Sequence, residues 1–321
     1  MKIKRIGLLT AGGDAPGMNS AIRSVVRYAL YHKLEVIGFY RGYWGLINEE
    51  LTVLDHRAVS GIINLGGTIL KTMRCQEFKT RKGQERAYHI IKKNALDALI
   101  VIGGDGTIRG AYEFTKRFSL PCVCIAASVD NDINGIDQTI GYDTAVNTAL
   151  SAIDNIRDTA TSMERIFVVE VMGRDSGFIA LQVALAGGCE NVIIPEKKFD
   201  LDIICHNIVE GNLRGKLSWI IVVAEGAASA REVADAITEK TSLETRVVVL
   251  GHIQRGGRPT ATSRFLGTLF GKYAVEILLN GQSNKVVGMS LGKVVAVDFE
   301  TALKKKEIPV DEIYHLINIL T

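Results

Sequence analysis

The chain is poor in cysteine and proline, and its few cysteines follow no functional spacing. Five of the 321 residues are cysteines and five are prolines. Disulfide frameworks and zinc sites need cysteines or histidines at characteristic separations, which do not occur in this sequence. We therefore expect reduced thiols that pack in the interior, at Cys75, Cys122, Cys124, Cys189 and Cys205.

A large charge excess and long apolar runs are also lacking. The formal net charge is +3 and the lysines and arginines are dispersed, so we expect no nucleic-acid partner, and any anion binding must be local. No apolar stretch approaches the roughly 18 to 20 residues of a membrane span. The start, M-K-I-K-R-I-G-L-L-T, runs into a glycine loop without a signal-like apolar region, so we expect a cytoplasmic protein without a membrane contact.

What the chain does have is glycine, with 32 residues, and a 47% share of hydrophobic residues. At this length, such a composition predicts a large core and two domains. Continuous apolar runs that alternate with helical patterns are typical of parallel sheets covered on both faces, which is the α/β class. The expected strands are Ile6–Thr10, Glu35–Tyr40, Leu99–Ile102, Cys122–Ala127, Ile166–Val171, Val192–Pro195, Trp219–Ala224 and Val247–Leu250. The helical patterns include Met18–Tyr31, Arg57–Leu65, Thr107–Phe118, Thr144–Ser162 and Ser229–Thr241.

These strands could form one sheet, but a polar, glycine-bearing stretch interrupts them. Residues 131–141, N-D-I-N-G-I-D-Q-T-I-G, are typical of a connector between two smaller sheets. Active sites often lie between two such halves. The tail from Val286 to Phe299 predicts a pair of strands joined near Gly292, followed by a charged helix and a last apolar segment. Its pattern does not indicate which sheet it joins.

Two acids follow the buried run that ends at Ala127. Asp130 and Asp132 are two positions apart in A-A-S-V-D-N-D. Alternate side chains of an extended segment point the same way, so we expect both carboxylates on one face of the crevice beyond the strand.

Glycine loops follow two other expected strands. In A-G-G-D-A-P-G-M-N, Gly12 and Gly13 leave room for a phosphate, and the next helix offers unpaired N–H groups. A tight turn that binds nothing is the alternative. In G-G-D-G-T, Asp105 stands beside a second such loop, and Thr107 is placed to cap the following helix. Magnesium takes one or two protein carboxylates, so Asp105 is a candidate ligand, with a helix-capping aspartate as the alternative.

Six ordered motifs identify a family. The chain resembles bacterial ATP-dependent 6-phosphofructokinases from residue 3 to about residue 290. The motifs are T-A-G-G-D-A-P-G-M-N, I-G-G-D-G-T, V-D-N-D-I with T-I-G-Y-D-T-A, V-E-V-M-G-R, A-G-G-C-E and L-G-H-I-Q-R-G-G. The resemblance implies two Rossmann-like domains with the active site between them. It assigns residues 1–138 and 251–303 to ATP binding, and 139–250 and 304–321 to fructose 6-phosphate binding.

The implied reaction transfers the γ-phosphoryl group of ATP to the 1-hydroxyl of fructose 6-phosphate, with Mg²⁺, in glycolysis. Asp130 would be the base, Arg174 would neutralise the transferring group, and Ser128 and Asp132 would orient the site and the metal. The implied ATP site comprises Gly12, Gly13, Arg74, Cys75, Gly104, Asp105, Gly106 and Thr107. The implied sugar-phosphate site comprises Ser128, Asp130, Arg165, Met172, Gly173, Arg174, Glu225, Arg246, His252 and Arg255.

The resemblance also implies partners and regulation. Arg165 and Arg246 would reach the site of a neighbouring subunit in a homotetramer. An effector site for ADP or GDP as activator and phosphoenolpyruvate as inhibitor would use Arg23, Arg27, Arg157, Gly188, Glu190, Arg214 and Lys216. The chain departs from the family pattern there, because His56 replaces an arginine and Leu217 and Ser218 replace basic residues. We therefore expect a weakened effector response.

Three other functions are compatible with parts of this sequence. Pyrophosphate-dependent relatives carry Asp and Lys where this chain has Gly106 and Ala127, which favours ATP as donor. NAD kinases and lipid kinases share G-G-D-G-T but lack V-M-G-R and G-H-I-Q-R-G-G. A catalytically silent regulatory subunit would lose an acid or an arginine at Asp105, Asp130 or Arg174, and all three are present.

Overall fold

The computed structural model describes residues 3–320 and contains two compact units. The first unit runs up to Thr144 and includes Arg255–Lys306; the second comprises Ala145–Gln254 and the segment from Glu307 onward. The expected domain boundaries lie a few residues before these divisions, and residues 1, 2 and 321 of that expectation lie outside the described part. Within residues 3–320, no helix is long and apolar enough to cross a membrane.

The first unit is built on a sheet whose central strands are fully buried. Its order is β12-β11-β5-β4-β1-β2-β3, with β6 paired to β5. The strands are β1 (Arg5–Thr10), β2 (Glu35–Phe39), β3 (Leu51–Val53), β4 (Ala98–Gly103), β5 (Cys122–Ser128), β6 (Ile140–Gly141), β11 (Lys285–Ser290) and β12 (Lys293–Asp298). The β2–β3 and β11–β12 pairs are antiparallel, and the others are parallel.

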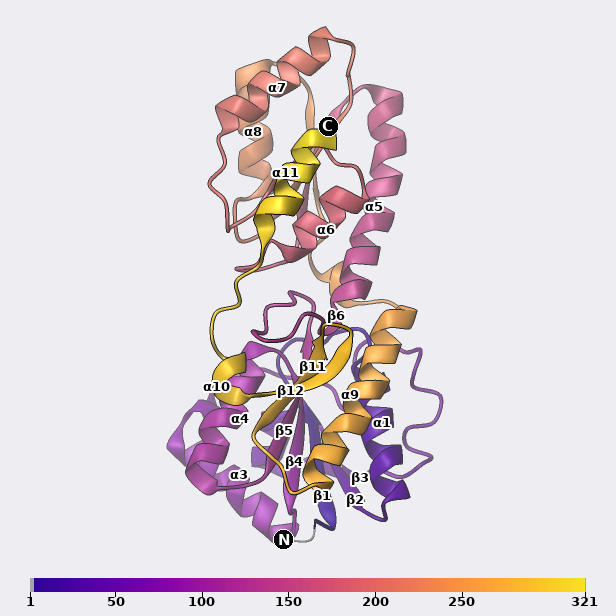
Figure 1. Cartoon of the computed structure of the whole chain (residues 1–321), viewed down its shortest axis with the longest axis vertical. Helices are drawn as coiled ribbons and strands as arrows, with labels where there is room; N and C mark the ends of the chain where they lie inside the picture. Colours follow the sequence, from indigo (N-terminus) through magenta and orange to yellow (C-terminus); the bar gives the residue numbers. More distant parts are fainter. Residues whose placement is uncertain (1–2, 321) are drawn as a thin grey trace. The chain divides into compact units, whose positions relative to one another are not determined.

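Helices cover both faces of this sheet because apolar side chains line both faces of its strands. Helices α1 (Met18–Tyr31) and α9 (Ala261–Leu279) lie beside each other on one face, while α3 (Arg81–Lys93) and α4 (Asp105–Phe118) cover the other (Figure 1). The short elements α2 (Tyr43–Asn48), η1 (Glu77–Lys79) and α10 (Phe299–Ala302) complete this unit. Phe39, Phe114 and Phe270 are among its fully buried side chains.

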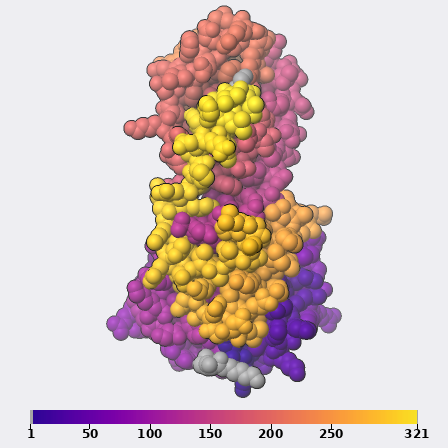
Figure 2. All heavy atoms as spheres, viewed as in Figure 1, coloured from indigo at the N-terminus to yellow at the C-terminus, as the bar shows by residue number. Residues whose placement is uncertain are grey.

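The second unit has an all-parallel sheet in the order β10-β7-β9-β8. Its strands are β7 (Ile166–Val171), β8 (Asn191–Ile193), β9 (Trp219–Ala224) and β10 (Thr245–Val249). Around them lie α5 (Tyr142–Met163), which begins in the first unit, α6 (Phe178–Ala186), α7 (Leu201–Leu213), α8 (Ala230–Thr241), η2 (Gly251–Arg255) and α11 (Val310–Leu320). Figure 2 shows α11, in yellow, at the surface of this unit. The expected α/β class with mainly parallel sheets is confirmed.

The tail resolves one question that the sequence left open. Strands β11 and β12 form the expected antiparallel pair, and β11 joins the first sheet beside β5. The expected charged helix after Phe299 is wrong in extent, because α10 ends at Ala302 and the next helix, α11, begins only at Val310. Residues 131–141 lie, as predicted, between strand β5 of the first sheet and the first strand of a second, smaller sheet. Ile140–Gly141 still pairs with β5, so the division between the two units falls just after this stretch.

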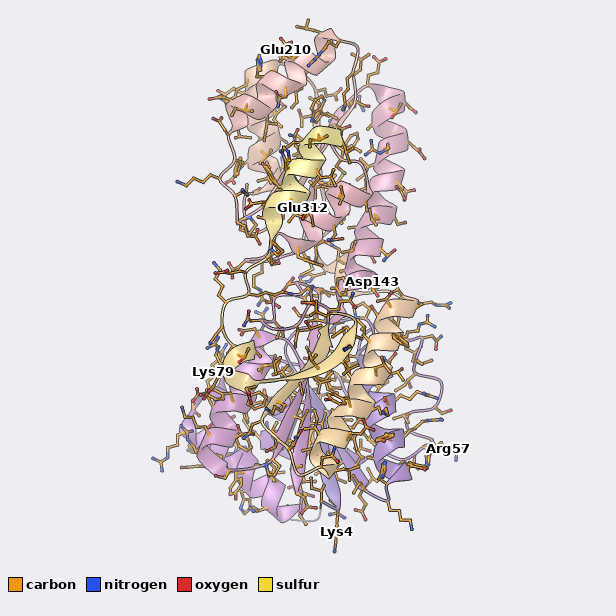
Figure 3. All side chains as sticks on the ribbon, in the orientation of Figure 1. Lys4, Arg57, Lys79, Asp143, Glu210 and Glu312 are labelled. Atoms are coloured by element: carbon orange, nitrogen blue, oxygen red, sulfur yellow. The ribbon has the colours of Figure 1, made fainter. Side chains whose placement is uncertain are left out.

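The predicted helix Arg57–Leu65 is wrong, because these residues form successive turns. The Asp55 carboxylate accepts hydrogen bonds from the N–H groups of Arg57 and Ala58 and holds the chain in a turn. The carbonyls of Ile63 and Leu65 accept from side chains of α1 rather than from a helical turn. Arg57 projects from this surface loop (Figure 3).

Candidate active site

Three loops lie side by side where β1, β4 and β5 end. The N–H of Ala11 donates to the Ile102 carbonyl at 3.0 Å, and the Thr107 hydroxyl donates to the Ala11 carbonyl at 2.9 Å. A Cβ on Gly104 would lie 3.7 Å from the Ser128 Cβ. The order β5-β4-β1 therefore brings the two glycine loops and the start of the acidic loop to one edge of the sheet.

The first loop depends on glycine for both conformation and space. Gly12 has φ of +86°, a left-handed conformation that favours glycine. A Cβ on Gly13 would lie 2.6 Å from the Arg255 guanidinium, whose Nη1 also donates to the Asp14 carbonyl at 3.2 Å. Arg255, expected at the sugar phosphate, thus belongs to the first unit and lies against the glycine loop. Gly13 is exposed, and the Arg255 cation lies directly against its backbone.

The second loop leads directly into α4. This helix begins at Asp105, after an extended Gly104, so the expectation that Thr107 caps it is wrong. The Thr107 hydroxyl contacts Ala11 instead. The Asp105 side chain is 40% exposed and lies 3.5 Å from Arg109. The space around a Cβ on Gly106 is open, which leaves the start of the helix accessible.

Asp105 is the predicted metal ligand, and the described residues offer no cluster of ligands in its place. Among residues 3–320, no group of three or more His, Cys, Asp and Glu side chains could hold a metal ion. An accessible carboxylate beside a phosphate loop nevertheless fits Mg²⁺, which takes few protein ligands and completes its shell with water and phosphate oxygens.

The loop after β5 buries Asp130 and holds Asp132 at its edge. Asp130 is 4% exposed, and the Ser128 hydroxyl donates to Asp132 Oδ1 at 2.8 Å. The two acids do not follow one another on an extended segment, as predicted, because Asp130 lies in a turn and Asn131 has φ of +50°. The side-chain amide of Asn131 instead organises the loop from within.

In the second unit, the loop after β7 meets the end of β9. The Arg174 N–H donates to Glu225 Oε1 at 3.1 Å, and the Met172 N–H donates to Gln254 Oε1 at 2.8 Å. Gln254 is completely buried. Arg174 itself has φ of +52° and an exposed side chain. Met172, Gly173, Arg174 and Glu225 are therefore brought together, as the resemblance implies.

Two predicted phosphate ligands of this unit, Arg165 and Arg246, bind the carboxylate of Glu244, a residue that was not predicted from the sequence. Glu244 Oε2 accepts from Arg165 Nε at 2.9 Å, and Glu244 Oε1 accepts from Arg246. His252 is exposed in η2. Gln254 lies within the motif L-G-H-I-Q-R-G-G, but the motif does not indicate that its side chain binds the Met172 N–H. Glu244 lies in none of the six motifs.

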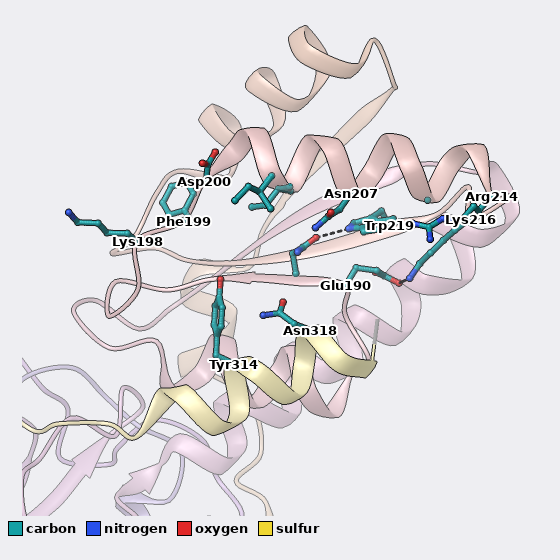
Figure 4. A pocket seen from close by; sticks show the side chains of 14 residues that line it. Glu190, Lys198, Phe199, Asp200, Asn207, Arg214, Lys216, Trp219, Tyr314 and Asn318 are labelled. Carbon is teal, nitrogen blue, oxygen red and sulfur yellow. Dashed lines mark hydrogen bonds and ion pairs between the residues drawn. The ribbon is translucent and has the colours of Figure 1, made fainter.

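Five of the seven predicted effector residues gather in the second unit. Arg157 donates to the carbonyls of Gly187 and Gly188 at 2.6 and 2.8 Å, and Lys216 lies 3.4 Å from Glu190. Glu190, Arg214 and Lys216 line a cavity of about 680 Å³ between α7 and α11, where the Lys216 ammonium lies 4.6 Å from the centre of the Trp219 ring (Figure 4).

The first unit carries the remaining candidates. Arg23 and Arg27 lie on α1, and Arg27 Nε is buried without a hydrogen-bond partner among the described residues. Arg74 is exposed and Cys75 is half-buried in a loop that Thr72 ties to the Gly12 carbonyl at 2.5 Å.

In the second unit, Cys189 lies beside the effector residues. Burial raises the pKa of its thiol to about 12.

Comparison with known proteins identifies the family of the chain. The family model described as phosphofructokinase matches residues 5–278. An ATP-dependent 6-phosphofructokinase of Halothermothrix orenii is 49% identical over 99% of this chain and all of that protein. One from Bacillus pumilus is 52% identical over 98% of both chains.

A solved structure agrees with the fold. The Pichia pastoris phosphofructokinase in the T-state superposes with a TM-score of 0.90 at 35% identity. The match covers 94% of this chain and 36% of that longer one. The matched family model, the two relatives that align over nearly their full length and the superposed fold all name the same family: the chain belongs to the phosphofructokinase family.

Proposed function

We propose that the chain is a kinase of glycolysis that transfers the γ-phosphoryl group of ATP to the 1-hydroxyl of fructose 6-phosphate, giving fructose 1,6-bisphosphate and ADP. The observation that carries the proposal is a buried carboxylate, Asp130, on a loop beside two glycine loops at neighbouring strand ends. The near-full-length relatives named above support the same reaction. The cytoplasmic location expected from the resemblance belongs to this proposal.

The first unit would hold the donor. Glycine loops let backbone N–H groups approach the nucleotide phosphates, and the start of α4 adds a positive dipole end. Asp105 would hold Mg²⁺, which supplies charge neutralisation on the donor phosphates when bound. Arg74 and Cys75 would lie along the nucleotide.

Asp130 would act as the general base of the reaction. It takes the proton of the attacking 1-hydroxyl as the bond from that oxygen to the γ-phosphorus forms and the bond to the ADP oxygen breaks. Ser128 would hold the Asp132 carboxylate in place near the reacting groups, through the hydrogen bond that its hydroxyl donates to Asp132 Oδ1 at 2.8 Å.

The second unit would supply the acceptor residues. Met172, Gly173 and Glu225 would bind the sugar, and the Arg174 guanidinium would neutralise charge on the transferring group. Arg165, Arg246 and His252, together with Arg255 of the first unit, would bind the 6-phosphate, since arginine forks match phosphate oxygens. The homotetramer implied by the resemblance would place Arg165 and Arg246 at the site of a neighbouring subunit.

A single substitution tests the role of the base. Asp130→Asn keeps the size of the side chain but removes its capacity to accept a proton. We expect kcat to fall by about 100-fold or more, while the dissociation constant of fructose 6-phosphate changes little. The matched control is Asp235→Asn at an exposed position of α8. If Asp130→Asn kept most of the turnover, Asp130 would not be the base.

A further inference from the structure

The loop that carries Asp130 and Asp132 lies between β5 and β6, outside helix and sheet pairing over most of its length. Backbone carbonyls in such a loop must find other partners when they are buried. Asn131 is completely buried and has φ of +50°, an uncommon conformation for a residue with a side chain. The neighbouring structure must therefore hold this turn in place.

Part of that restraint comes from inside the loop. The Asn131 amide donates to the Asp137 carbonyl at 2.6 Å, and its oxygen accepts from the Thr139 N–H at 3.0 Å. The Thr139 hydroxyl donates to the Ser128 carbonyl at 2.6 Å. These bonds close the loop on itself but leave the Asn131 carbonyl, directly between the two acids, to another partner.

That partner comes from 175 residues further along the chain. Lys306 Nζ donates to the Asn131 carbonyl and to the Ile136 carbonyl, both at 2.7 Å. The backbone of Lys305 pairs with Ile133 in an antiparallel bridge. The segment after α10 thus lies along the acidic loop, and one ammonium group clamps both sides of it.

The environment of Lys306 is that of a structural cation rather than a surface lysine. Its side chain is half-buried. Burial lowers its pKa below the ordinary value, whereas the negative charges of Asp137 and Asp132 act in the opposite direction. Hydrogen bonds from a charged donor are stronger than those between neutral groups, so this clamp restrains the turn more than a neutral side chain would.

We propose that Lys306 is a positioning residue for phosphoryl transfer: through the Asn131 and Ile136 carbonyls it fixes the turn that presents Asp130 and Asp132. The proposal rests on the function of Asp130 given above. Lys306 touches neither reacting group and acts through the backbone between the two acids. Because transfer depends on a closely aligned base, a shift of the turn by about 1 Å lowers the rate by up to about 100-fold.

The kinetic test compares three variants of the full-length chain. Lys306→Met keeps the length of the side chain but removes the donors, Lys306→Arg restores a charged donor, and Lys305→Met changes the exposed neighbour. We expect Lys306→Met to lower kcat by about 10-fold to 100-fold with KM for fructose 6-phosphate nearly unchanged. Lys306→Arg should recover a large part of the loss, and Lys305→Met should behave like the unchanged protein.

Hydrogen exchange provides a readout that does not depend on the reaction. The amides of residues 129–139 should exchange faster in Lys306→Met than in the unchanged protein, whereas the amides of β4 should not. Unchanged exchange in 129–139, or a normal kcat in Lys306→Met while Asp130→Asn is inactive, would overturn the proposal. A raised KM at constant kcat would do the same. Activity retained in Asp130→Asn would instead contradict the proposed function, so the two failures are distinguishable.

Discussion

Arg165 and Arg246 are held together on the two oxygens of one carboxylate, that of Glu244. The two arginines come from neighbouring segments, before β7 and within β10, whose strands pair in register. Glu244 neutralises part of their mutual repulsion and keeps both guanidinium groups at one end of the sheet. A phosphate dianion can replace or join this carboxylate as their partner, since both present oxygens to the same fork.

Subunit complementation tests whether these arginines serve a neighbouring site. Arg246→Ala and Asp130→Ala chains should each be nearly inactive alone. Dissociating and reassembling them together should restore activity, because random pairing across an isologous interface gives roughly a quarter of sites with both residues intact. The measurement is specific activity after mixing, with mixed oligomers verified by mass. Mixed oligomers without recovered activity would show that each site is built within one chain.

A charge at residue 106 tests the donor assignment. Gly106→Asp places a carboxylate in open space at the start of α4. The helix dipole stabilises an acid at this end of a helix, so the substitution should not impair folding. Repulsion from the nucleotide phosphates should raise KM for ATP by about 10-fold or more, with KM for fructose 6-phosphate nearly constant. The neutral Gly106→Asn is the matched control. Equal effects of the two substitutions would point to shape rather than charge.

Effector binding can be tested most cleanly at Arg214. Its Nε donates to the Glu210 carbonyl of its own helix, whereas Arg157 also supports the Gly187 and Gly188 carbonyls. We propose, from the resemblance, that ADP activates and phosphoenolpyruvate inhibits at this cluster. Arg214→Ala should then abolish both responses while leaving the basal rate intact. Fructose 6-phosphate saturation curves with each effector measure this, with Arg231→Ala as control.

The replacement at residue 56 gives a matching gain-of-function test. We expect His56→Arg to strengthen both effector responses, because an arginine fork restores a phosphate ligand. If activation or inhibition by an effector survived in Arg214→Ala, the effector would bind at another site.

Cys189 gives a pH-dependent prediction. Its pKa is raised to about 12, chiefly by burial, so at pH 8 a thiolate fraction on the order of 10⁻⁴ remains. Iodoacetamide should modify half-buried Cys75 long before Cys189. Because the folded-state pKa lies above the ordinary value of 9.0, Cys189 stabilises the fold at low pH, and this contribution is lost as pH rises from 9 toward 12. In denaturant titrations at a series of pH values, the free energy of unfolding should decline less steeply above pH 9 for Cys189→Ala than for the unchanged protein. Rapid alkylation of Cys189 in the folded protein would contradict the raised pKa.

Much of the architecture followed from pattern alone. Buried apolar runs such as Cys122–Ala127 predicted parallel strands, and their ends located the glycine and acidic loops. The failures came from contacts that are distant in sequence. Residues 57–65 have a helical pattern, but side chains of α1 and the carboxylate of Asp55 satisfy their backbone in turns. Threonine is a common helix cap, and Thr107 was predicted to cap the following helix. Its hydroxyl instead donates to the Ala11 carbonyl and so links the two glycine loops.

The supporting residues were invisible for the same reason. Gln254 positions the Met172 N–H from more than 80 residues away. Lys306 reaches the acidic loop across an even longer separation in sequence. Neither the motif around Gln254 nor a lone lysine at residue 306 indicates such a partner, because only the folded chain brings the two together.

The most direct test of the proposed reaction gives the unchanged protein either of two donors and measures both products. Purified protein, Mg²⁺ and fructose 6-phosphate are incubated with ATP or with pyrophosphate, and phosphorus NMR follows the sugar phosphates. We expect fructose 1,6-bisphosphate and ADP in equal amounts from ATP, and kcat/KM about 100-fold lower with pyrophosphate. A higher kcat/KM with pyrophosphate, or no phosphorylation at the 1-hydroxyl with ATP, would contradict it.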